Sequence, residues 1–445
     1  MKLANISRVS NSICRKVVQH DFYDTAEQVA AVVLLNSPSN GPQEYEEYLR
    51  LLLRKRLAPE SQGPSSSSHC YFVCADGAYP RLQAYVDEQH KHRLHLRPLI
   101  SFPLCDAVIG DMDSYASSSG KAGIKWPLSS SYDAYATVDD IPTDVLSVVH
   151  ERSRIAVAQF HTPSEGVNAS PRTSQEKVFE KRSAQLSLSP LHLHVRCQMT
   201  TDFMKALLLL GRLRKQYPDT AVVVPPPVLR SPSGMQLLST GGSLLPNASS
   251  VGSDLDDDRE RKICEEASGV EALSLPTYLA IGGLGGRFDH DMAAISVMLS
   301  FQKDAHVVLT DSTNTIFACQ PDGWTQVVRQ PHHEGVMCSF INFGRMKECE
   351  TSGLLWNVVN GRRKPSETRD LVLGFGELIS ACNVFRREVA TIDLRRLYPK
   401  KGRQAPAKTE PKTDKCDDEE EEEEEEEDCN PPTIFTIERQ CGKHG

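Results

Sequence analysis

Three short apolar runs, each followed by aspartate or glycine, constrain the fold of this chain most. The runs cover residues 71–75, 107–109 and 278–281. Such runs are typical of buried strands, and helical segments are expected between them. A chain that alternates strands and helices forms a mostly parallel sheet, whose strands end along one crevice. We therefore expect the three aspartate or glycine ends to lie in one shared site.

A glycine-rich turn, GGLGG at residues 282–286, follows the third run and precedes Arg287, Asp289 and an apolar helical segment. Glycine has no Cβ, so backbone N–H groups can approach an anion closely, and a helix N-terminus adds positive potential. The turn therefore indicates a phosphate cradle. Taken alone, such a turn is also compatible with a tight connection that binds no ligand.

Aspartates follow the other two runs. Asp111 and Asp113 come directly after Gly110, and Asp76 stands beside Gly77 after the first run. Two carboxylates across such a turn can converge on one hard cation, and Mg²⁺ bound to nucleotide phosphates takes one or two carboxylates of this kind. An Asx-rich turn that only closes a strand is the alternative interpretation.

Five sequence blocks that occur in order resemble those of the thiamine pyrophosphokinase family. The blocks are CADGAYPRL at 74–82, DAVIGDMDS at 106–114, QMTTDFMKA at 198–206, GGLGGRFDH at 282–290, and GLLWN at 353–357 with FGELISACN at 375–383. The resemblance covers roughly residues 30–114, 196–216 and 276–390. It implies transfer of the pyrophosphoryl group of ATP to the hydroxyl of thiamine, which gives thiamine diphosphate and AMP.

The resemblance also implies a catalytic and metal-binding set. Asp76, Asp111 and Asp113 would hold Mg²⁺ against the phosphates of ATP. Gln198 and Asp202 would align the metal or a substrate from the start of a helix. Catalysis of this kind consists largely of positioning and charge neutralisation, and no general base is identifiable.

The nucleotide and thiamine contacts are implied in the same way. Gly77, Gly285 and Gly286 would admit the phosphates, and Arg287 would neutralise their charge. Asp289 either orients Arg287, contacts the nucleotide or caps the helix. Thiamine would be bound by Trp356, Ser380 and Asn383, with Trp356 stacking from a second subunit of a homodimer. Without the resemblance, the period-two spacing of Leu354, Trp356 and Val358 favours a core aromatic instead.

Several departures from the family pattern keep other classes of function open. Met199 stands where the family usually has an acidic residue, and Ala381 and Cys382 replace two hydroxyl residues. These changes are compatible with a thiamine- or nucleotide-binding regulator that has lost activity. A phosphohydrolase of the haloacid dehalogenase type, with Asp111 as nucleophile, is a further alternative. Tyr115 stands where that motif requires threonine or valine, which counts against it.

The expected fold class is α/β. We predict an open parallel α/β domain at residues 20–305, which binds ATP and contains irregular insertions at about 115–195 and 226–270. A small antiparallel β-sandwich at 306–395 would bind thiamine, with short strands at 306–310, 315–319, 325–328, 336–343, 354–359 and 371–373. Residues 396–445 are expected to form a disordered acidic tail.

The charge and the cysteine content of the chain limit its possible binding partners and its expected cellular compartment. The formal net charge is -9, but residues 417–428 are twelve consecutive acids, and without them the charge becomes +3. No basic patch indicates nucleic acid, and no apolar run reaches the length of a membrane span. The 13 cysteines include no Cys-x-x-Cys pair, so we expect reduced thiols in the cytoplasm. The basic start, from Lys2 to Lys16, leaves organelle import as an alternative.

Overall fold

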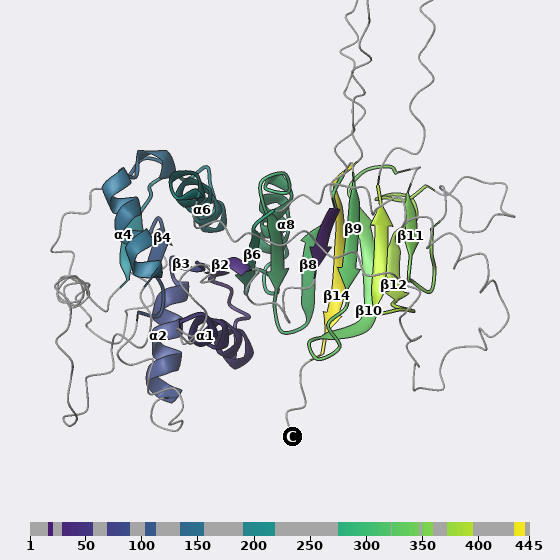
Figure 1. Cartoon of the computed structure of the whole chain (residues 1–445), viewed down its shortest axis with the longest axis horizontal. Helices are drawn as coiled ribbons and strands as arrows, with labels where there is room; N and C mark the ends of the chain where they lie inside the picture. Colours follow the sequence, from purple (N-terminus) through teal and green to yellow (C-terminus); the bar gives the residue numbers. More distant parts are fainter. Residues whose placement is uncertain are drawn as a thin grey trace, which may run out of the picture.

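A mixed ten-stranded sheet forms the centre of the computed structural model (Figure 1). The structure describes residues 17–20, 29–56, 69–89, 103–112, 134–154, 190–218, 275–321, 323–346, 349–358, 372–394 and 431–440. The parallel half of the sheet consists, in spatial order, of β5 (Leu191–His194), β4 (Ala107–Gly110), β3 (Tyr71–Ala75), β2 (Val29–Leu34), β6 (Thr277–Ile281) and β7 (His306–Thr310). The strands β2, β3, β4 and β6 are almost wholly buried on both faces, so their sequences are nearly continuous apolar runs.

The same sheet continues beyond β7 with antiparallel strands. They are, in order, β8 (Asn314–Ala318), β14 (Thr433–Arg439), β10 (Glu334–Asn342) and β12 (Ser380–Val384). Strand β7 itself pairs in parallel with β6. The domain boundary expected between residues 305 and 306 therefore lies just before β7, whereas the change from parallel to antiparallel pairing comes after β7, between β7 and β8. The two expected domains thus share one sheet.

Helices cover both faces of the parallel half (Figure 1). One face packs against α1 (Pro42–Arg56) and α2 (Ala78–Gln89), and the other against α4 (Thr143–Ser153), α6 (Asp202–Gln216) and α8 (Phe288–Ser300). The helix α6 begins where its sequence predicts, because the Thr201 side chain accepts a hydrogen bond of 3.1 Å from the Met204 N–H. A short 3-10 helix, η3 (Val138–Asp140), precedes α4.

A second sheet of four strands packs on the antiparallel half. Its order is β1 (Val17–His20), β9 (Trp324–Val328), β13 (Val389–Asp393) and β11 (Glu350–Ser352). Large apolar side chains from both sheets fill the space between them, among them Phe317, Val327, Phe340, Phe385, Ile392 and Phe435. The expected α/β class with a small β-sandwich is therefore confirmed.

Three sequence expectations need correction. Residues 431–440 are not a disordered tail, since β14 lies between β8 and β10 in the large sheet. The first insertion is not wholly irregular, because α4 packs against β3. Residues 354–359 and 371–373 are not strands where they are described; they contain only isolated bridges at Leu354 and Leu373. The second insertion and the acidic run lie outside the described residues.

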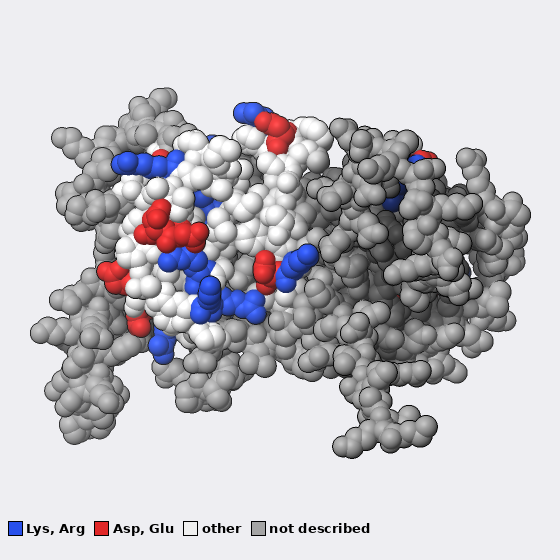
Figure 2. All heavy atoms as spheres, turned by 90° about the horizontal axis from the view of Figure 1, so that it is seen from above, with Lys and Arg blue, Asp and Glu red and all other residues white. Residues whose placement is uncertain are grey.

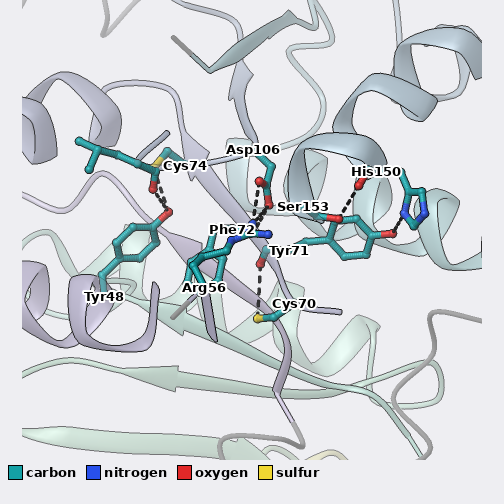
Figure 3. Close-up of polar contacts among 10 residues, drawn as sticks. Tyr48, Arg56, Cys70, Tyr71, Phe72, Cys74, Asp106, His150 and Ser153 are labelled. Atoms are coloured by element: carbon teal, nitrogen blue, oxygen red, sulfur yellow. Dashed lines mark hydrogen bonds and ion pairs between the residues drawn. The ribbon is translucent and has the colours of Figure 1, made fainter. Parts of the chain in front are cut away.

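Buried polar contacts hold together the amino-terminal ends of β3 and β4 (Figure 3). Arg56, at the end of α1, donates to both carboxylate oxygens of Asp106 at 2.8 and 2.9 Å, and Asp106 also accepts from the Phe72 N–H at 2.8 Å. The Arg56 and Asp106 side chains are 5% and 3% exposed. This network joins α1, β3 and the start of β4.

Neither positive nor negative side chains dominate the described surface on the face drawn in Figure 2. On the face in Figure 2, described lysine and arginine side chains lie next to aspartate and glutamate side chains. No helix within the described ranges is long and apolar enough to cross a membrane.

Candidate active site

Three carboxylates converge at the carboxyl ends of β3 and β4. Asp76 follows β3, Asp111 follows β4, and Asp202 is the first residue of α6, which packs against both strands. One carboxylate oxygen from each of the three lies within 4.8 Å of the others. Asp76 is buried, and the other two are half-buried. Three acidic oxygens at such spacing are the donor set that a hard divalent cation prefers.

Gly110 makes this convergence possible. A Cβ at this position would lie 2.7 Å from the Asp76 Cβ and 3.1 Å from the Asp202 Cγ. The chain then turns sharply, with Met112 in the left-handed region at a φ of 63°. Asp113, the third ligand expected from the sequence, lies outside the described residues. The structure instead brings Asp202 to the two expected carboxylates.

Polar neighbours hold two of the carboxylates. The Gln198 Nε2 donates to the Asp111 Oδ2 at 3.1 Å, and the Lys205 Nζ donates to the Asp202 Oδ1 at 3.0 Å. Lys205 is buried although it carries a charge. Gln198 and Asp202 thus lie beside the expected metal ligands. Met199 is 93% exposed and points away from the packed interior.

The glycine-rich turn, residues 282–286, is packed against the segment that follows β2. Gly282, Gly285 and Gly286 have φ values of 78°, 79° and 112°, which favour glycine. The Ser37 hydroxyl donates to the Gly285 carbonyl at 2.9 Å, and the Ser39 hydroxyl donates to the Leu284 carbonyl at 2.9 Å. Sequence reasoning missed this β2 segment; its signal is the Ser-Pro-Ser-Asn stretch directly after a buried strand.

Arg287 and Asp289 form an exposed ion pair at the start of α8. The Arg287 Nε donates to one Asp289 carboxylate oxygen at 3.0 Å, and a guanidinium Nη donates to the other. The hydrogen bond from Arg287 lowers the pKa of Asp289, and the same contact raises the pKa of Arg287. Among the alternatives for Asp289, this geometry favours the one in which it orients Arg287.

Trp356, Ser380 and Asn383 lie together on the antiparallel half. The Asn383 side chain is buried and bridges the Trp356 backbone: its Oδ1 accepts from the Trp356 N–H at 3.2 Å, and its Nδ2 donates to the Trp356 carbonyl at 3.0 Å. The Asn383 Nδ2 also donates to the Ser380 Oγ at 3.3 Å. Trp356 is 43% exposed, so it is not a core aromatic.

The acidic cluster (Asp76, Asp111 and Asp202) and the Trp356 group (Trp356, Ser380 and Asn383) lie far apart within one chain. The Trp356 group borders β12, an edge strand, whereas Asp76 follows β3, seven strand positions away. At about 4.8 Å per strand, the separation is roughly 34 Å. The glycine-rich turn is closer to the acidic cluster, since β6 and β3 are separated by β2 alone. One chain therefore places the acidic cluster and the turn at the same edge of the parallel strands, but not the Trp356 group.

Comparisons with known proteins point to one family. Residues 325–398 match the family model described as "Thiamin pyrophosphokinase, vitamin B1 binding domain". Thiamine pyrophosphokinase 3 of Oryza sativa subsp. japonica is 30% identical over 130 residues, which are 29% of this chain and 45% of that protein. Thiamine pyrophosphokinase 1 of Arabidopsis thaliana is 30% identical over 136 residues, 30% of this chain and 45% of that protein. These matches span less than half of the relatives' length.

The chain is also similar to solved structures. Yeast thiamin pyrophosphokinase matches with a TM-score of 0.43 and 15% identity, over 96% of this chain and 92% of that chain. The enzyme from Candida albicans matches with a TM-score of 0.40 and 12% identity, over 96% of this chain and 94% of that chain. The sequence matches confirm the family resemblance.

Proposed function

We propose that this chain, which resembles the thiamine pyrophosphokinases, transfers the pyrophosphoryl group of ATP to the hydroxyl of thiamine. One observation carries the proposal: three carboxylates from separate elements converge beside a glycine-rich turn, in a chain whose residues 325–398 match a vitamin B1 binding domain. The products would be thiamine diphosphate and AMP.

The acidic cluster fits a divalent cation, and we take this cation to be Mg²⁺. Asp76, Asp111 and Asp202 would hold it; Asp113, the ligand expected from the sequence, stays a further candidate. Bound there, Mg²⁺ would supply charge neutralisation at the phosphate oxygens. Gln198 would orient Asp111 through the 3.1 Å hydrogen bond between them.

The chain's own groups would then position ATP along the crevice. Gly77 adjoins Asp76 at the end of β3, and Gly285 and Gly286 leave room for phosphates to approach the backbone. Arg287, held by Asp289, would add positive charge at the phosphates. The reaction needs the thiamine oxygen in line with the departing AMP oxygen, so most of the barrier reduction would come from this positioning.

Thiamine binding requires a second copy of the chain in this proposal. Trp356, Ser380 and Asn383 lie roughly 34 Å from the acidic cluster of their own chain, on the strand-spacing estimate. A homodimer in which β12 of one protomer reaches the crevice of its partner would complete two sites. Exposed Phe375 and Leu378, near β12, are apolar side chains that such an interface would cover.

We also propose that the protein acts in the cytoplasm. The described cysteines are free thiols, and most are buried. Reduced cysteines are typical of that compartment.

The direct test incubates purified protein with thiamine, ATP and Mg²⁺, and resolves AMP from ADP by chromatography. AMP formed in step with thiamine diphosphate would support the proposal. ADP with thiamine monophosphate would indicate ordinary kinase chemistry instead. Thiamine binding without any product would indicate a regulator, and phosphate release from simple esters would indicate a phosphohydrolase. An Asp111→Asn variant should lose turnover but keep its thermal midpoint.

A further inference from the structure

We propose that Ser37 and Ser39 are positioning residues for the nucleotide: their hydroxyls fix the glycine-rich turn so that two backbone N–H groups face the phosphates of ATP. The inference rests on the proposed function, because it assigns a task within the same site. Neither serine belongs to the sequence blocks that resemble the family.

The hydroxyls bind carbonyl oxygens of the turn. The Ser39 Oγ donates to the Leu284 carbonyl at 2.9 Å and lies 3.1 Å from the Gly285 carbonyl, which also accepts from the Ser37 Oγ at 2.9 Å. The two hydroxyl oxygens are 2.7 Å apart. Two successive carbonyls of the turn are therefore directed toward the segment after β2.

The direction of the carbonyls fixes the direction of the N–H groups. In a trans peptide the C=O and the following N–H point in opposite directions, and no cis peptide occurs among the described residues. The N–H groups of Gly285 and Gly286 must therefore point away from the two serines. Within the described part of the chain, neither N–H group donates to another residue. Successive N–H groups on one side of a glycine turn form a concavity that binds anions.

The serines would also remove an obstacle to phosphate binding. Carbonyl oxygens that faced the crevice would repel phosphate oxygens, and the hydroxyl donors keep the carbonyls of Leu284 and Gly285 on the opposite side. The glycine-rich turn is packed so closely against the segment after β2 that it has little room to move. A Cβ on Gly285 would lie 2.8 Å from the Ser39 Oγ, and one on Gly282 would overlap the Asn40 side chain.

The segment after β2 that carries Ser37 and Ser39 is held by α2, the helix that follows Asp76 of the acidic cluster. The Arg81 guanidinium, on α2, donates to the Ser37 carbonyl at 3.0 Å, and the Asn40 N–H donates to the same oxygen at 3.2 Å. The helix α2 begins two residues after Asp76. The segment thus sets the position of the glycine-rich turn relative to a carboxylate of the proposed metal site.

The test compares Ser39→Thr with Ser39→Val, two variants of nearly equal shape that differ in the hydroxyl. Ser39 is exposed, so the added methyl group has room. We expect Ser39→Val to raise the KM for ATP and the Kd for Mg·ATP about tenfold, the loss expected for a neutral hydrogen bond. Ser39→Thr should remain within about twofold of the unchanged protein. The KM for thiamine and the thermal midpoint should change little in either variant, which a general loss of structure would not allow.

Binding of Mg·ATP, measured by calorimetry without thiamine, separates this inference from the proposed function. Equal Kd values for the two variants would overturn the role of the hydroxyl, even if the protein makes thiamine diphosphate. A hydroxyl-dependent Kd would support it, even if no thiamine diphosphate forms and the proposed function fails. Failure of the unchanged protein to bind Mg·ATP would overturn both.

Discussion

Replacing Gly110 by alanine should disable the acidic cluster without unfolding the protein. The new Cβ would lie 2.7 Å from the Asp76 Cβ, whereas ordinary contacts begin at 3.4 Å, so the two must separate by about 0.7 Å. The obstacle is the stem of Asp76, close to its backbone, and it cannot swing aside as a flexible side-chain end would. Metal–ligand distances tolerate only about 0.2 Å, and displacements near 1 Å can cost about 10²-fold in rate.

We therefore expect Gly110→Ala to lower kcat/KM about 100-fold and to raise the Mg²⁺ concentration needed for half-maximal activity. The assay follows thiamine diphosphate formation over a range of Mg²⁺ concentrations, beside Mn²⁺ binding measured by electron paramagnetic resonance. Unchanged metal binding in a folded variant would refute the reasoning.

The matched control is Gly211→Ala. Gly211 lies within α6, and apart from its chain neighbours and the adjacent backbone of its own helix, no described atom would lie within 4 Å of its new Cβ. Alanine is favoured over glycine inside a helix by about 0.5–1 kcal/mol, so this variant should be slightly more stable and fully active. Equal loss of activity in both variants would mean that glycine replacement, rather than crowding of the cluster, causes the effect.

Three further predictions concern stability. Asp106→Asn should cost about 3–5 kcal/mol in a urea titration, because the buried Arg56 loses its counter-charge, and adding Arg56→Met should restore most of that loss. Burial lowers the pKa of His69 from 6.5 to about 4; the unfolded chain therefore binds more protons in this window, and the urea midpoint should fall as the pH drops from 6.5 to 4. In His69→Phe the urea midpoint should depend less on pH over this range. An unchanged pH dependence in that variant would mean that another group causes it. Gly353→Ala should lower the thermal midpoint, since a φ of 74° alone costs other residues about 1–3 kcal/mol and the Cβ would overlap the Val389 carbonyl. An unchanged midpoint would contradict this backbone conformation of Gly353 and its close contact with Val389.

The sequence indicates the position of Asp76 and Asp111 at neighbouring strand ends because the evidence for it is local. Each apolar run ends directly at Asp76, Gly110 or Gly282, and strand ends of a parallel sheet must meet at one edge. The third carboxylate could not be derived from spacing. Asp202 joins Asp76 and Asp111 because α6 packs across β3 and β4, and this contact arises between segments about 90 or more residues apart in sequence.

The errors have physical causes as well. Residues 433–439 read TIFTIER, a strand-like alternation that the preceding twelve acids obscured. Residues 354–359 are apolar enough for a strand, but the Asn357 Oδ1 accepts from the Leu354 N–H at 3.1 Å and closes a turn instead. The Ser37–Ser39 contacts depend on two loops that meet only in the folded sheet.

The position of β14 has a consequence for synthesis of the protein. Residues 433–439 form the only described link between β8 and β10 in the large sheet, so a growing chain that ends at residue 394 would hold two incomplete sheets with open edges. Each open edge could pair with another chain until β14 arrives. Ile434 must then find Ala318, more than 100 residues back, and such long-range pairing is slow. Completion of the large sheet would therefore require β14 to insert between two halves that are made before it, a stage at which chaperones could act on the newly made protein.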